Sequence, residues 1–189
     1  MSKLPKHLIF SAIIIFVALK MSLPLITTGL YIQWQLWIPV ALWLLGSKIG
    51  FIILELDRLV DIYLVRPDTQ LAYHVKQLFA QKRYRQGWSL IIQNKSLQPN
   101  LTFRSAVFQV IWVFLAIFAF TSTESFFGKG FIIGLGLKLL LDQWQDYLTN
   151  KTFLKQWLFW QVNRHFTDKE LTIYLSFITA ITFWLLLII

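Results

Sequence analysis

The chain contains no cysteine, which excludes disulfide bridges, thiolate metal sites and cysteine catalysis. It is also poor in acidic residues, with 9 Asp and Glu against 18 Lys and Arg and a formal net charge of +9. The short motifs of zinc proteases, P-loop enzymes, serine hydrolases and dinucleotide-binding folds are all missing. The three histidines, His7, His74 and His165, are far apart in the chain and build no site. The sequence therefore indicates none of these enzyme classes.

Apolar residues are what the sequence has in excess. Hydrophobic residues make up 57% of the chain and aromatic residues 17%, and the mean hydropathy is +0.59. A soluble domain of 189 residues could not bury so much apolar surface. We therefore predict an all-α fold that forms one polytopic integral membrane domain.

Five apolar stretches are suited to crossing a bilayer, which takes about 20 residues of helix. We predict spans at about 8–29, 34–56, 106–123, 126–144 and 171–189. The apolar run that begins at Leu8 is followed by Lys20 rather than by a small-residue cleavage site, so we interpret it as a retained span. Near the proposed membrane interfaces, where indole is favoured, lie Trp34, Trp37, Trp112, Trp144 and Trp184.

The distribution of basic residues predicts the orientation. They are concentrated in segments 3–6, 58–104 and 151–169, whereas the other two loops are nearly uncharged. Because Lys and Arg accumulate in cytoplasmic loops, we expect the N-terminus and both long segments in the cytoplasm and the C-terminus outside. A bacterial inner membrane fits this pattern. The same rule explains the basic charge without nucleic acid, which we do not expect as a partner.

The two long segments, 66–100 and 151–166, are predicted to lie at the cytoplasmic interface. Leu71, Val75 and Phe79 recur at helical spacing in the first segment, beside basic residues, and the second repeats this pattern. We expect an amphipathic helix in each segment, lying on the inner leaflet and attracted to anionic lipids. The first segment is too short to bury a core alone.

Small residues at a spacing of four occur in the second and fourth spans. Gly46 and Gly50 form one pair, and Gly130 and Gly134 form the other. Because small residues let helix backbones approach closely in a membrane, we predict that these two spans pack centrally against each other.

A lysine in the middle of a span is costly, and Lys48 occupies that position in the second span. Two interpretations stay open. Lys48 either faces the protein interior and pairs with Glu55 or Asp142, or extends its ammonium toward the inner surface. Lys138 can pair with Asp142 at a spacing of four residues.

Carboxylates cluster where the second and fourth spans end. Asp57 and Asp61 share one helix face, Asp142 and Asp146 share another, and Glu55 adds a fifth acid. If the two spans are neighbours, these acids converge at the cytoplasmic rim, where such an oxygen-rich cluster would bind Mg²⁺. The alternative is structural: the acids end their helices and pair with basic side chains such as Arg58, Arg66 or Lys138.

The motif Asp57-Arg58-x-x-Asp61, followed by Arg66-Pro67, resembles the aspartate-rich motif of the UbiA-type membrane prenyltransferases. The resemblance implies Mg-diphosphate held by two such motifs on separate helices. It covers only this short stretch. Ile53-Leu54 stand where that family has an Asn-Asp pair, and that family has more spans.

These patterns lead us to expect a non-enzymatic membrane component without a cofactor: a transporter or channel unit, or an assembly or accessory subunit. Its partner would be another membrane protein or further copies of the chain. The alternative is a Mg-dependent enzyme acting on a lipid or prenyl diphosphate at Asp57, Asp61, Asp142 and Asp146. A transporter needs a polar cavity around Lys48, an accessory subunit needs an exposed helix face unsuited to lipid, and the enzyme needs the four aspartates to converge.

Overall fold

The computed structural model describes residues 6–27, 37–98, 100–122, 124–162, 164 and 166–188. The predicted span ends at 28–29 and 34–36, together with Trp34 and His165, lie outside these ranges. All regular structure in the described residues is helical, so the predicted all-α class is confirmed at that level.

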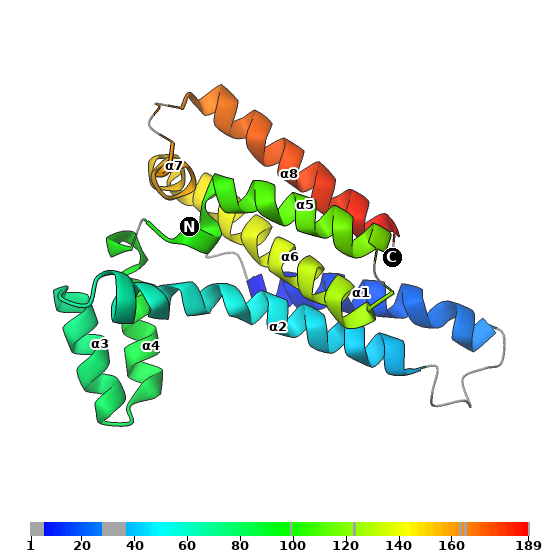
Figure 1. Cartoon of the computed structure of the whole chain (residues 1–189), viewed down its shortest axis with the longest axis horizontal. Helices are drawn as coiled ribbons and strands as arrows, with labels where there is room; N and C mark the ends of the chain where they lie inside the picture. Colours follow the sequence, from blue (N-terminus) through cyan, green and yellow to red (C-terminus); the bar gives the residue numbers. More distant parts are fainter. Residues whose placement is uncertain are drawn as a thin grey trace.

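Five long helices form a bundle (Figure 1). Helices α2 and α6 run in one direction along it, and the other three run in the opposite direction. Three short helices gather at one end of the bundle, which we call the hairpin end, whereas the C-terminus lies at the far end. The long helices are α1 (Lys6–Thr27), α2 (Ile38–Val60), α5 (Ala106–Ser122), α6 (Phe126–Thr149) and α8 (Asp168–Ile188).

Helix α6 is the centre of the bundle. Its residues from Ile132 to Gln143 are all buried, and α1, α2, α5 and α8 pack around it. The outward faces of the surrounding helices carry exposed apolar side chains, among them Phe16, Leu45, Phe114 and Phe177. An exposed apolar surface spread over several helices marks contact with a membrane or with another protein.

Two helical stretches are long and apolar enough to cross a membrane, Ile38–Val65 and Asp168–Ile188. This is weak support for a membrane location, and it does not confirm the five predicted spans. Two further apolar stretches, Leu8–Ser22 and Ala106–Ser122, are shorter. Helix α6 is long enough to cross a membrane but is not among these apolar stretches, because it carries Lys129, Lys138, Asp142 and Asp146. Most of these charges are buried against other helices, so α6 does not need an apolar surface all round.

The contact between α2 and α6 is made by the glycine seam, which comprises Gly46, Gly50, Gly130 and Gly134. A Cβ atom at any of these positions would lie less than 3.0 Å from backbone atoms of the facing helix. The contact is reciprocal, because Gly46 lies against the Phe127 carbonyl and Gly130 lies against the Trp43 carbonyl. Each carbonyl belongs to the residue three positions before the opposite glycine. Such close approach also permits weak Cα–H···O contacts between the helices.

The segment predicted to hold one amphipathic helix, 66–100, instead forms a helical hairpin of α3 (Gln70–Ala80) and α4 (Tyr84–Gln93). A π-helical turn, η3 (Asp61–Val65), joins it to α2, and two 3₁₀ turns, η4 (Lys95–Leu97) and η5 (Thr102–Arg104), lead on to α5. The Thr69 hydroxyl caps α3 by accepting a hydrogen bond from the Ala72 N–H.

The hairpin encloses a small apolar core, formed by the buried side chains of Ile62, Ala72, Val75 and Ile91. The expectation that this segment lacks the length for a core holds only for the segment alone, because Ile62 belongs to η3 at the end of α2. The two short helices and the end of α2 together bury apolar side chains that a single helix would leave exposed.

The second segment contains α7 (Lys151–Phe159). Its apolar residues Leu154, Trp157 and Leu158 are buried together with Ala106 and Leu171, at the starts of α5 and α8. The apolar face of α7 therefore packs on the bundle and is not available to a lipid leaflet. Trp112, which the sequence placed near an interface, is also buried, against Gly136, and its Nε1 donates to the Ile132 carbonyl at 3.0 Å.

Candidate functional site: a buried ion cluster and a lateral groove

Six charged side chains meet toward the hairpin end of the bundle, where α1, α2 and α6 come together with η5. We call this group the buried ion cluster: Lys6, Glu55, Arg58, Arg104, Lys138 and Asp142. Lys138 Nζ lies 2.6 Å from the Glu55 carboxylate and 3.5 Å from the Asp142 carboxylate. Asp142 also pairs with Lys6 and with Arg104. Four cations thus surround two carboxylates.

Arg104 connects the two carboxylates of the cluster. It pairs with Asp142 through Nη1, and its Nη2 lies 3.5 Å from Glu55. Burial disfavours the charged guanidinium, but the carboxylates of Asp142 and Glu55 outweigh that effect and raise the pKa of Arg104 above its ordinary value. Arg104 therefore keeps its charge, and removal of one carboxylate would leave buried cations without a partner.

All four aspartates of the predicted quartet bind one connecting segment, residues 95–104, within which Pro99 lies outside the described residues. The segment crosses from the hairpin to α5 and supplies a donor to each carboxylate. Along the segment, the pairs are Lys95 with Asp146, Gln98 with Asp61, the Phe103 N–H with Asp57, and Arg104 with Asp142. The aspartates therefore fasten this segment across the ends of α2 and α6.

Asp61 and Asp146 also accept hydrogen bonds from side chains outside the 95–104 segment. Arg66 binds Asp61 through two parallel hydrogen bonds of 2.8 and 2.7 Å, the bidentate geometry that suits a carboxylate. Trp157 Nε1 donates to Asp146 at 3.1 Å, which ties α7 to α6. Sequence reasoning identified Arg58, Arg66 and Lys138 as basic partners but missed Lys6, Lys95 and Arg104.

The convergence that a Mg²⁺ site needs is not found in the described part of the chain. No group of three or more His, Asp or Glu side chains there is arranged to hold a metal ion. The two aspartate motifs that the prenyltransferase resemblance implies do lie at the ends of neighbouring helices. Their carboxylates, however, bind separate donors from the 95–104 segment.

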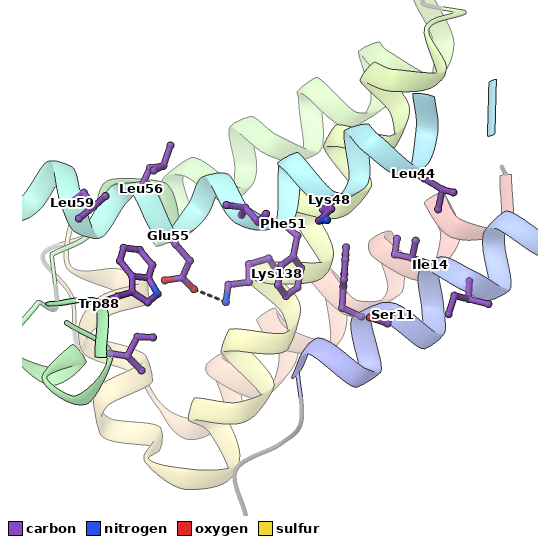
Figure 2. A pocket seen from close by; sticks show the side chains of 14 residues that line it. Ser11, Ile14, Leu44, Lys48, Phe51, Glu55, Leu56, Leu59, Trp88 and Lys138 are labelled. Atoms are coloured by element: carbon purple, nitrogen blue, oxygen red, sulfur yellow. Dashed lines mark ion pairs between the residues drawn. The ribbon is translucent and has the colours of Figure 1, made fainter. Parts of the chain in front are cut away.

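A groove lies on the side of the bundle, lined by residues of α1, α2, α4 and α6 (Figure 2). It encloses about 760 Å³. Most of its lining is apolar, for example Phe10, Ile14, Phe51, Ile52 and Trp88, and its polar members are Ser11, Lys48, Glu55 and Lys138. The rings of Phe10 and Phe51 lie 4.0 Å apart between centroids, so α1 and α2 are in contact at the groove.

Lys48 is the unmatched charge of this groove. Its side chain is exposed, and no hydrogen bond or ion pair joins its ammonium to a residue within the described ranges. Of the two interpretations left open for Lys48, the pairing with Glu55 or Asp142 is not found among the described residues. Both acids pair with other cations, and Glu55 lies seven residues along α2, about 10 Å away at the helical rise.

A second polar group, which sequence reasoning missed, links α5, α6 and α8. The Gln109 Oε1 atom accepts hydrogen bonds from Gln143 Nε2 at 2.5 Å and from the Tyr174 hydroxyl at 2.8 Å. Gln109 Nε2 donates to the Arg104 carbonyl at 3.0 Å. Glutamines inside apolar helices are the signal that could have identified this network.

Comparison with protein-family models, curated proteins and solved structures gives no match for this chain.

Proposed function

We propose that the chain is an integral membrane protein with five spans, located in a bacterial inner membrane with the hairpin end in the cytoplasm. Three observations support this placement: the exposed apolar faces of the outer helices, the two long apolar helices, and the basic residues that gather toward the hairpin end. Bundle helices of 17 to 24 residues extend about 25 to 36 Å, comparable to a hydrocarbon core of about 30 Å.

We infer that this membrane protein is a non-enzymatic accessory or assembly subunit of a larger complex. The observation that carries this inference is Lys48, a charged side chain exposed on the outer side of the bundle near the middle of α2. A lysine at this depth costs roughly 2.5 to 3.5 kcal/mol when lipid surrounds it. A subunit that is complete only with a partner has a reason to expose such a residue.

A transport or channel unit is the second candidate, favoured by the position of Lys48 in a cavity. Transport through the bundle needs polar side chains along its whole length. Among the described residues, the buried charged groups lie toward the hairpin end, while the far half of α6 packs through glycine and aliphatic side chains. This distribution favours the subunit over the transporter.

The Mg-dependent enzyme has the weakest support, because the 95–104 segment already binds its four aspartates. Native mass spectrometry of the protein, extracted gently from its own membrane, tests the three roles. We expect a second protein at fixed stoichiometry. A monomer or homo-oligomer without a partner would contradict the subunit and favour transport, and a monomer that retains Mg²⁺ and a lipid would favour the enzyme.

A further inference from the structure

We propose that the lateral groove docks a transmembrane helix of another protein, and that an Asp or Glu at mid-depth on that helix pairs with Lys48. This inference rests on the proposed membrane placement and subunit role, and it names the partner's chemistry and its binding surface.

The charge balance of the groove calls for one anion. Of its three charged lining residues, Lys138 and Glu55 pair with each other at 2.6 Å across the wall (Figure 2), and both have further partners in the buried ion cluster. Lys48 remains, and no residue in the described ranges pairs with it. Intramembrane charges are typically paired with one another, so the missing partner is a carboxylate or another anion at the same depth.

The depth of Lys48 favours a protein helix over an anionic lipid. Lys48 follows Ile38, the first residue of α2, by ten residues, which corresponds to about 15 Å along the helix. That is half the thickness of a hydrocarbon core of about 30 Å. A lipid phosphate lies at the headgroup level, whereas a carboxylate on a crossing helix can be placed at any depth.

A second copy of this chain cannot supply the carboxylate. The chain has nine acidic residues, and the five on α2, η3 and α6 all accept from donors within the chain: Glu55, Asp57, Asp61, Asp142 and Asp146. The other four lie in loops or at helix starts, away from mid-depth: Asp68, Glu124, Asp168 and Glu170. Of these, Asp168 and Glu170 also accept from donors within the chain, from Lys155 and Arg164. The partner must therefore be a different protein.

The shape of the groove also suits a helix. Apolar side chains of α1 and α2 form its walls, among them the exposed Ile15, Leu44 and Ile52. Trp88 and Ile92 of α4 close it at the hairpin end. A row of side chains on a partner helix would pack between α1 and α2 as ridges pack into grooves elsewhere.

The test uses the full-length protein in phosphatidylcholine nanodiscs and synthetic membrane-spanning peptides. The peptides are leucine-rich helices that differ only in their central residue, which is Glu, Gln or Leu, and association is measured by fluorescence energy transfer. We expect the Glu peptide to bind roughly tenfold more tightly than the Gln peptide, as a desolvated ion pair of this kind would give.

Three variants locate the interaction. Lys48→Met should abolish the preference for Glu, and Lys48→Glu should transfer the preference to a peptide with a central Lys. Ile52→Trp should block the groove and weaken every peptide equally. Lys129→Met, which removes a charge from the start of α6 outside the groove lining, should leave the preference unchanged.

Equal binding of the Glu and Gln peptides to the wild-type protein would overturn the proposal, as would a preference that survives Lys48→Met. Loss of the Glu preference on adding phosphatidylglycerol would assign the groove to an anionic lipid instead. The proposed subunit role is tested separately by native mass spectrometry. If a fixed partner is found there but Lys48→Met and Ile52→Trp leave its stoichiometry unchanged, the docking proposal fails and the subunit role stands.

Discussion

The two halves of the α2–α6 pair are held together by different interactions, close backbone packing in one half and buried ion pairs in the other. In the far half, the glycine seam brings backbone against backbone without any charged group. In the half near the hairpin end, the two helices are joined directly by the Glu55–Lys138 ion pair, and further partners for Glu55, Asp57 and Asp142 come from α1 and the 95–104 segment. The seam is a contact between two helices alone, whereas the ion cluster requires most of the chain to be in place. Perturbing each half should therefore give different kinds of failure.

The largest effect is expected from Asp142→Asn in the buried ion cluster. The change would leave Lys6, Arg104 and Lys138 with Glu55 as their nearest carboxylate in the cluster. Breaking a buried pair in this way costs about 3 to 5 kcal/mol, so the midpoint of thermal unfolding in detergent should fall by roughly 10 °C or more. Asp168→Asn, an ion-paired but exposed position, is the matched control and should change the midpoint little. Equal midpoints for the two variants would show that the cluster does not stabilise the fold.

A smaller but clear loss of stability is expected from Gly50→Ala in the seam. The new Cβ would lie less than 3.0 Å from the Phe131 carbonyl, so α2 and α6 must separate. Overpacking of this kind costs about 1 to 3 kcal/mol. Gly128→Ala is the control, because its Cβ would meet only the Ser125 side chain at 3.5 Å. Gain of helix propensity should make that variant as stable as the wild type or slightly more stable. The midpoint of thermal unfolding in detergent measures the stability of both variants. A Gly50→Ala protein as stable as the wild type would contradict the close packing of α2 against α6 at the seam.

A local effect is expected from Arg66→Gln at the junction of the hairpin with the bundle. The change removes the bidentate pair with Asp61 but leaves the Gln98 hydrogen bond at 2.9 Å. We expect a cost of about 1 kcal/mol, confined to opening of the hairpin. Limited proteolysis should show faster cleavage near residues 81–83 while the thermal midpoint of the bundle stays unchanged. Faster cleavage throughout the bundle would mean that the hairpin and the bundle unfold together.

The smallest effect, a gain in stability, is expected from Lys82→Gly in the turn between α3 and α4. Lys82 has φ 59°, a left-handed conformation that costs a side chain energy and glycine nothing. The added flexibility of glycine in the unfolded chain offsets part of the relief, which leaves a gain of roughly 0.5 kcal/mol. Slower limited proteolysis of the hairpin in the Lys82→Gly variant than in the wild type would show this gain in stability. Arg83→Gly, at a neighbouring position with φ −87°, should give no such gain.

The features that could be predicted from the sequence are those that depend on neighbours along the chain. The paired spacing of Gly46 with Gly50 and of Gly130 with Gly134 indicated the α2–α6 contact, and the spacing of Lys138 and Asp142 indicated their ion pair. The partners in the 95–104 segment were not predictable in this way, because Gln98 and Asp61 are 37 residues apart and no periodic pattern joins them.

Lys48 shows why the chemistry of a residue does not determine its direction. Its expected cost in a membrane drew attention to it. That cost alone does not tell an inward-facing lysine from an outward-facing one until the partners of the nearby acids are known. Once Arg104 and Lys138 bind Glu55, the interior holds no free carboxylate near Lys48. The hairpin was missed for a related reason. The α3 apolar stripe can face either lipid or a second helix, and the sequence pattern is the same in both cases.

The pair between Lys6 and Asp142 joins residues that are 136 positions apart, and this separation sets a time order for biogenesis. At synthesis rates of about 5 to 20 residues per second, Lys6 is synthesised roughly 7 to 27 s before Asp142. Throughout that interval the Lys6 ammonium has no Asp142 carboxylate to pair with and must be solvated by water. The bundle can therefore close at its hairpin end only after α6 has been delivered. A chain that stops before α6 would therefore leave Lys6 and Arg104 without the Asp142 carboxylate with which they pair in the finished protein.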